Sequence, residues 1–148
     1  MTDTNGKVLQ LYITKSDKEK TRIPKECVHL DQQGVQEDKF YAKDSKRAIL
    51  ITSKESYELA QNNAIDIDSG ILGENILIDI NPYALLPGDR LQIGDALLEI
   101  TQNCTLCKGL TSINAKLPKL LKNDRGIFAQ ALNSANICKG DSVILLNR

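Results

Sequence analysis

Two cysteines follow the end of an apolar, strand-like run in the second half of the chain. The run Ala96–Ile100 is followed, after Thr101-Gln102-Asn103, by Cys104 and Cys107, which are three residues apart. A cysteine thiolate can act as a nucleophile or bind a soft metal ion. Residues that follow a strand are well placed for such chemistry, because a rigid scaffold holds them. The spacing therefore points to a redox pair, to half of a metal site or to two structural thiols.

The sequence around this pair of cysteines bears on each of these alternatives. A thioredoxin-type pair opens a helix, whose first turn lowers the thiol pKa, and the sequence Lys108-Gly109-Leu110-Thr111 is a poor helix start. A zinc site could join Cys27 and His29 to Cys104 and Cys107, although structural zinc sites usually have two Cys-x-x-Cys-type knuckles. His29, the single histidine, is more simply explained as an ordinary strand residue. A purely structural role for both cysteines also remains open, since free cysteines are often buried.

The composition sets the class of protein. The 148 residues fit one domain with one core; 41% are hydrophobic, 26% are charged, and the formal net charge is zero. A nucleic-acid binder with a broad basic surface is disfavoured by that balance. No signal peptide and no apolar run long enough to span a bilayer are present. We therefore expect a cytosolic protein without a membrane partner, whose four cysteines, Cys27, Cys104, Cys107 and Cys138, are thiols or metal ligands.

The elements that must position the thiols are mostly strands. Alternating or continuous apolar runs predict strands over 7–14, 27–30, 48–51, 76–80, 91–93, 96–100, 127–132 and 142–146. Helices are predicted over 54–61, after an N-cap at Thr52 or Ser53, and over 116–122. Gly94-Asp95 predicts a hairpin turn, and the polar stretch 34–47 a long loop. Many short strands with glycine-containing turns indicate a β-barrel or sandwich.

Other catalytic signatures do not occur. The sequence has no phosphate-binding Gly-x-x-x-x-Gly-Lys loop, no Gly-x-Gly-x-x-Gly fingerprint and no Gly-x-Ser-x-Gly elbow. What remains is a single nucleophilic or metal-binding thiolate served by cations, for which Lys108, Arg47 and Arg125 are candidates. Nearby cations stabilise a thiolate and also hold anionic phosphates.

The order of turns and thiols resembles the MOSC family, which is named for the C-terminal part of molybdenum cofactor sulfurase. The similarity runs from about residue 8 to 146 through a set of short motifs: Gly34 to Lys39, Arg47, Gly73-Glu74-Asn75, Gly88-Asp89, Leu91 to Ala96, Leu98 to Gln102 with Cys107, Arg125 to Ala129, and Gly140 to Val143. The resemblance implies a single domain over 1–148, of the stand-alone bacterial type. It also implies a mainly β, closed and mostly antiparallel barrel, like that of pyruvate kinase, with one to three short helices.

The resemblance also implies a site. Cys107 falls on the family cysteine, which would be a catalytic residue and the molybdenum ligand, and Cys104 would be the second catalytic thiol. Residues proposed to hold a molybdopterin-type cofactor are Lys39, Arg47, Glu74, Asn75, Lys108 and Arg125. Asp38 would orient a basic partner. A link to pyridoxal phosphate follows from family association alone.

One motif departs from the family pattern. Members commonly carry Gly-Asp-Arg-His where this chain has Glu37-Asp38-Lys39-Phe40. Glycine tolerates a positive φ at little cost, so its replacement by Glu37 predicts a differently folded loop.

Three functions follow from the resemblance and its alternatives. The first is a molybdenum-dependent reductase of small N-hydroxylated compounds, which requires an external electron donor because no flavin or iron–sulfur pattern is present. The second is a sulfur carrier that holds a persulfide on Cys107 and takes its sulfur from a cysteine desulfurase. The third is a binding barrel without catalysis.

Overall fold

The computed structural model describes residues 5–17, 21–104, 110–122 and 124–146. Its elements, in chain order, are β1 (Asn5–Thr14), β2 (Arg22–Lys25), β3 (Cys27–Asp31), β4 (Gly34–Val35), the 3₁₀ turn η1 (Ser45–Arg47), β5 (Ile49–Ser53), α1 (Lys54–Asn62), β6 (Ile76–Ile78), β7 (Arg90–Ile93), β8 (Ala96–Asn103), α2 (Leu110–Ile113), α3 (Leu117–Leu120), β9 (Ile127–Ala131), β10 (Ala135–Cys138) and β11 (Ser142–Leu146).

Seven of the described strands close into a barrel. The order β11-β7-β8-β9-β5-β6-β1 returns on itself because β1 also pairs with β11, through Asn5 and Ile144. Every pair in this ring is antiparallel except β5 with β6, which is parallel. The expected mainly β, closed and mostly antiparallel barrel is therefore confirmed. Strand β2 extends the sheet outward from β1.

Side-chain alternation explains how the strands fill the barrel. On β5, Ile49 and Ile51 join the barrel core, while Leu50 between them points to the outer face and contacts a separate apolar group. On β9, Ile127 and Ala129 likewise join the core, and Phe128 points outward beside Leu50. All five residues of β5 are buried, because both of its faces are covered, as is usual for a strand with a parallel neighbour.

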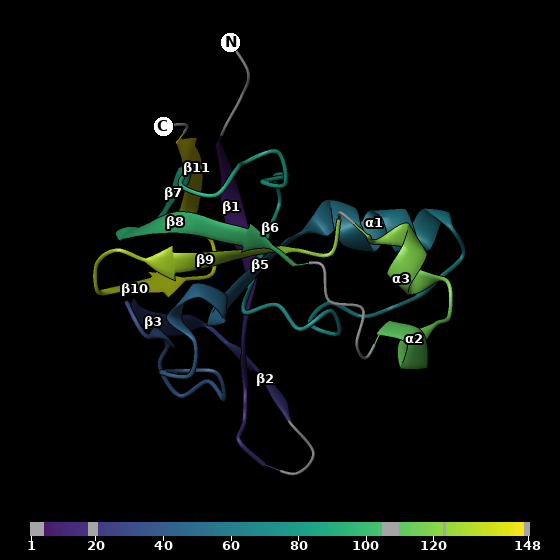
Figure 1. The fold of residues 1–148 in the computed structure, drawn as a ribbon, viewed down its shortest axis with the longest axis horizontal. Helices are drawn as coiled ribbons and strands as arrows, with labels where there is room; N and C mark the ends of the chain where they lie inside the picture. The colour runs from purple at the N-terminus through teal and green to yellow at the C-terminus, as the bar shows by residue number, and fades with distance from the viewer. Residues whose placement is uncertain (1–4, 18–20, 105–109, 123, 147–148) are drawn as a thin grey trace.

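The remaining elements flank the barrel (Figure 1). Strands β10, β3 and β4 form a small second sheet. The helices lie together on one side, where Leu72, Leu110, Leu117 and Leu121 pack around Ala60 of α1 in a core of their own. In the described part of the chain, no helix combines the length and the apolar character that a bilayer crossing requires.

Most of the predicted elements are confirmed, and the differences are local. The hairpin of β7 and β8 turns at Gly94, as predicted. The N-cap of α1 is Ser53, whose hydroxyl accepts from the N–H of Glu55, whereas the Thr52 hydroxyl donates to the carbonyl of Arg125. Strands β2, β4 and β10 and helix α2 were not predicted.

One prediction from the composition is wrong. Cys27 and Cys138, expected to be thiols or ligands, form a disulfide between directly paired positions of β3 and β10, with their Cα atoms 4.0 Å apart. The prediction rested on the expected compartment, and the register of β3 and β10 overrides it by placing the two side chains together.

Candidate functional site

The site begins with the turn that precedes β6. Gly73 has φ +92°, which suits glycine, and Asn75 then joins three segments. Its side-chain oxygen accepts from the N–H of Leu50 at 3.0 Å, and its side-chain nitrogen donates to the carbonyl of Tyr12 and to Asp38, each at 3.3 Å. Asn75 is 4% exposed. The structure thus uses this amide to hold β1, β5 and the Asp38 turn in register.

Glu74 is fully enclosed. Its carboxylate accepts from the Tyr57 hydroxyl, with oxygen–oxygen distances of 2.9 and 2.7 Å, and from the N–H of Gly70 at 3.0 Å. Burial raises the pKa of Glu74, while these hydrogen bonds and the charge of Arg22 act to lower it. Burial also raises the pKa of Tyr57, so that this phenol stays neutral. The buried Glu74 carboxylate therefore holds Tyr57 of α1 and the backbone at Gly70 in place.

Arg22 belongs to this site although the sequence did not single it out. Its guanidinium donates to the Thr14 hydroxyl at 2.6 Å and to the carbonyl of Glu74, and it lies 5.3 Å from the centre of the Tyr12 ring. Its Nε is buried and has no hydrogen-bond partner among the described residues. Burial lowers the pKa of Arg22, and the carboxylates of Glu74 and Asp38 oppose that shift. Its neighbours come from β1, the turn before β6 and the Asp38 turn, so no local sequence motif predicts its place in the site.

The turn around Asp38 holds two of the predicted residues, of which Asp38 is buried and Lys39 is half-buried. Asp38 is 5% exposed and accepts from the N–H of Thr14 at 2.7 Å, while the N–H of Lys39 donates to the carbonyl of Thr14 at 2.7 Å. The Lys39 ammonium lies 5.4 Å from the centre of the Phe40 ring. Glu37 has φ +72°. Glu37 therefore adopts the left-handed conformation, which costs a non-glycine residue about 1 kcal/mol.

An outward-facing apolar group, which we call the Leu50 cluster, consists of Leu50, Cys104 and Phe128. Cys104 is 3% exposed, and its N–H donates to the carbonyl of Gly126 at 3.0 Å. The cluster lies on the outer face of β5 and β9, not in the barrel interior. Cys107 and Lys108, the predicted metal ligand and its neighbouring cation, lie outside the described residues.

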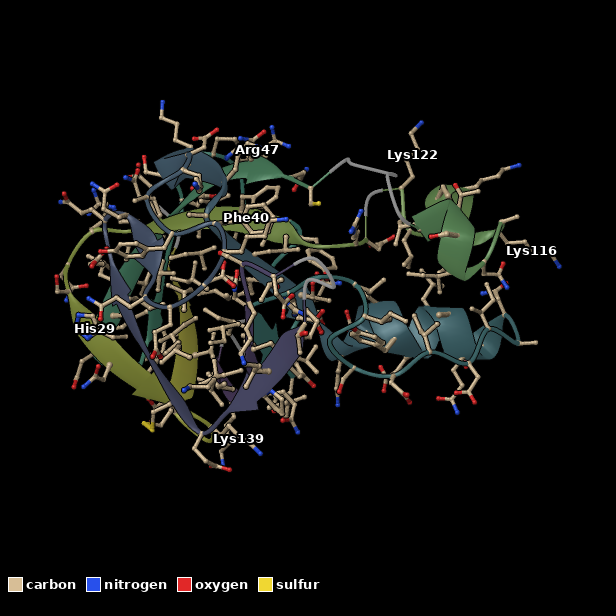
Figure 2. All side chains as sticks on the ribbon, turned by 90° about the horizontal axis from the view of Figure 1, so that it is seen from below. His29, Phe40, Arg47, Lys116, Lys122 and Lys139 are labelled. Carbon is tan, nitrogen blue, oxygen red and sulfur yellow. A yellow bond between two sulfur atoms is a disulfide. The ribbon has the colours of Figure 1, made fainter. Side chains whose placement is uncertain are left out.

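Two arginines border the Leu50 cluster. The exposed Arg47 lies over the Phe128 ring, 5.7 Å from its centre. The half-buried Arg125 donates from Nε and Nη2 to the carbonyl of Leu72, at 3.2 and 3.1 Å. A Cβ built on Gly73 would lie 3.8 Å from Arg125 Nη2 and 3.9 Å from Leu50 Cδ2, which places both side chains at the same turn. Figure 2 shows Arg47 on the same side of the barrel as Phe40.

The alternative metal site finds no support in this arrangement. Cys27 is bonded to Cys138, and His29 pairs through Nδ1 with the Asn136 side chain at 2.6 Å on the neighbouring strand. Within residues 5–17, 21–104, 110–122 and 124–146, no group of three or more His, Cys, Asp or Glu side chains could hold a metal ion. An open depression of about 250 Å³ is lined by Asp31, Gln32, Gln33, Asn133 and Ser134 and contains neither a thiol nor a cation.

The comparisons with known proteins agree with the fold. The model of the MOSC domain family matches residues 29–144. A search of curated proteins found no match. Nothing in these comparisons supports a link to pyridoxal phosphate.

Solved structures give the same architecture at low sequence identity. The YuaD protein from Bacillus subtilis has a TM-score of 0.79 and 17% identity, over 94% of each chain. YiiM from Geobacillus stearothermophilus has a TM-score of 0.74 and 19% identity, over 97% of this chain and 76% of the other. YiiM from Escherichia coli has a TM-score of 0.71 and 18% identity, over 99% and 71%. At these identities the likeness shows the fold alone.

Proposed function

This chain belongs to the MOSC domain family, and on that basis we propose that it binds an anionic, molybdopterin-type cofactor beside the Leu50 cluster. One observation carries the proposal. Arg47 lies on Phe128, and Arg125 lies beside the Gly73 turn next to Leu50. Both cations therefore border the group that contains Cys104, from which the chain continues to Cys107.

The residues present suit the chemistry of such a cofactor. A phosphate takes charge-assisted hydrogen bonds from guanidinium and ammonium groups, which Arg47, Arg125, Lys39 and Lys108 would supply. A soft metal is suited to a thiolate. Because Cys104 is enclosed within the Leu50 cluster, we assign the ligand role to Cys107. Glu74 and Asn75 act as positioning residues, since their polar atoms are bonded within the protein.

The reaction that we propose is the reduction of an N-hydroxylated small molecule. The N–O bond breaks, two electrons from an external donor and two protons from solvent are taken up, and the amine-type product and water leave. The bound molybdenum would supply the two-electron redox chemistry. The protein's own part is to bind the anionic end of the cofactor, to hold the thiolate and to keep the site rigid through Asn75 and Asp38.

Metal and pterin analysis of natively purified protein tests the proposal. We expect molybdenum and pterin in the parent protein and in Cys104→Ser, which is the matched control within the same Cys-x-x-Cys motif. We expect Cys107→Ala to lose the molybdenum. Equal molybdenum loading of Cys107→Ala and the parent would refute the ligand assignment.

The same preparation separates the rival functions. A parent protein without molybdenum that gains a sulfur atom on Cys107, after incubation with a cysteine desulfurase and cysteine, would be a sulfur carrier. In that outcome the sulfur atom leaves cysteine as alanine forms, and mass spectrometry locates it as a persulfide. A protein that shows neither loading nor a sulfur adduct would be a binding barrel without this chemistry.

A further inference from the structure

Phe40 is placed where burial does not account for it. It is one of only two phenylalanines in a chain that has no tryptophan, and its side chain is 48% exposed. Burying a phenylalanine typically contributes about 1.5–3 kcal/mol, and much of that gain is forgone here. The other phenylalanine, Phe128, is 8% exposed. Aromatic side chains commonly line ligand sites, so an exposed ring close to the proposed site is a candidate contact for a ligand.

The backbone that carries Phe40 is held firmly. Its N–H donates to Asp38 Oδ2 at 3.1 Å, and its carbonyl accepts from the N–H of Lys43 at 3.2 Å. Asp38 is itself anchored by the N–H of Thr14 and the side chain of Asn75. The ring is thus presented from a turn whose carboxylate is nearly buried and fully engaged. Such support is what a binding residue needs to keep its position.

Phe40 is also connected to the proposed cofactor site. Asp38 bonds Asn75, and Asn75 bonds the backbone of Leu50, which packs with Cys104. Lys39 lies against the Phe40 ring, and Arg47 lies on the same side of the barrel, whereas His29 and Lys139 lie on other sides (Figure 2). An aromatic face with one cation against it and a second cation on the same side of the barrel matches a planar heteroaromatic ring that carries a phosphate.

We infer that Phe40 is the stacking platform for the pterin ring of the bound cofactor, with Lys39 and Arg47 holding its phosphate. This inference rests on the proposed function and deepens it by assigning the ring and the phosphate to separate side chains. Stacking is indifferent to the phosphate, so removing the ring of Phe40 weakens binding of pterins with and without it. Removing the two cations weakens only the phosphorylated ligand.

Binding of simple pterins to cofactor-free protein tests the inference. The protein is produced in a host that cannot make the molybdenum cofactor and is titrated with neopterin and with neopterin monophosphate, followed by pterin fluorescence. We expect Phe40→Ala to raise the Kd for both probes by roughly 5- to 100-fold, the range found for loss of one stacking contact. Phe40→Tyr keeps the aromatic face and is expected to bind as the parent does.

Two further variants serve as controls. Leu86→Ala removes another exposed apolar side chain, which is 61% exposed, and is expected to leave both Kd values unchanged. The double variant Lys39→Gln/Arg47→Gln is expected to bind neopterin as the parent does and to lose the preference for the monophosphate. Circular dichroism checks that each variant is folded.

Several results would overturn the inference. Equal Kd values for Phe40→Ala and the parent would do so, as would the failure of the parent to saturate with either probe. Molybdenum loading is measured separately, on protein from a cofactor-producing host. A Phe40→Ala protein that loads normally and binds pterins normally would leave the proposed function standing without this role. A parent that binds neopterin through Phe40 but never acquires molybdenum would refute the function and keep the ring site.

Discussion

At the scale of single residues, the acidic and amide side chains of the Gly-Glu-Asn turn hold the site together. The family resemblance placed Glu74 and Asn75 among the cofactor-binding residues, and the structure gives their polar atoms partners from the protein itself. Arg22 completes this network from β2. Buried polar groups of this kind are stable only when they are paired, so their replacement has measurable costs.

Glu74→Gln is expected to change how stability depends on pH. Because burial raises the folded-state pKa of Glu74 above its ordinary value of 4.5, the folded protein binds the proton more tightly than the unfolded chain does. Stability is therefore lost as pH rises from that value through the folded-state pKa. Glutamine cannot titrate. The difference in stability between Glu74→Gln and the parent should therefore favour the variant more at neutral pH than at acidic pH. Urea unfolding from about pH 4 to about pH 8 measures this, and parallel profiles would contradict it.

Asn75→Ala is expected to cost about 2–3 kcal/mol, since it leaves the buried N–H of Leu50 without its acceptor. The chain offers a matched control in Asn133, which makes the same kinds of bond, accepting from the N–H of Leu97 and donating to the carbonyl of Asp95, but at an exposed position. Asn133→Ala should cost under about 1 kcal/mol because water replaces the lost partner. Similar losses in urea unfolding for both variants would contradict the argument.

At the scale of elements, the periodic segments were predictable and the irregular ones were not. The alternation of apolar residues in β1, β7 and β8 predicted these strands. Strand β2 escaped because it is short, polar and carries Pro24, which is acceptable where a strand pairs on one side only. The Ser53 cap was one of two options that local spacing could not separate. A contact between residues far apart in sequence decides which of the two caps the helix, because the Thr52 hydroxyl donates to the carbonyl of Arg125.

Glu37→Gly is expected to stabilise the protein by about 0.5–1 kcal/mol, because glycine takes the positive φ of this position without strain. The exposed ion pair of Glu37 with Lys25, at 3.6 Å, contributes little against this gain. Glu58→Gly, at an exposed position inside α1, should instead destabilise by about 1 kcal/mol. Thermal unfolding of the two variants should therefore move in opposite directions, and a loss of stability in Glu37→Gly would refute the strain argument.

At the scale of the whole molecule, closure of the barrel and formation of the small second sheet both depend on contacts between residues far apart in sequence. The number and spacing of the strands predicted a barrel or a sandwich, and the family resemblance implied the closed barrel. The pairing of β3 with β10 was not predicted, because the two cysteines lie 111 positions apart in the sequence. The grouping of Arg22, Glu74 and Tyr57 was not predicted for the same reason, because these residues are far apart in sequence. Local patterns therefore predicted the strands and the resemblance implied the closed barrel, while the tertiary register decided which polar groups meet.

Reduction of the Cys27–Cys138 disulfide is expected to lower the free energy of unfolding by about 2–4 kcal/mol, because the bond closes a long loop in the unfolded chain. The double variant Cys27→Ser/Cys138→Ser should show a similar loss and no further response to reductant. Cys104→Ser should keep the full response. Denaturant unfolding with and without dithiothreitol measures the effect, and a parent protein that does not respond would contradict the assigned bond.

The pairing of β1 with β11 has a further consequence, because Asn5 lies directly opposite Ile144. The two described ends of the chain meet in one ladder, at one end of the barrel in Figure 1. A short linker from Leu146 to Asn5, with new ends opened between the exposed Asn62 and Asn63, would give a circular permutant with every strand pair intact. We expect it to fold cooperatively and to form the Cys27–Cys138 bond. In that case folding does not depend on the order of the strands along the chain. It depends on the closed ring of strand pairs.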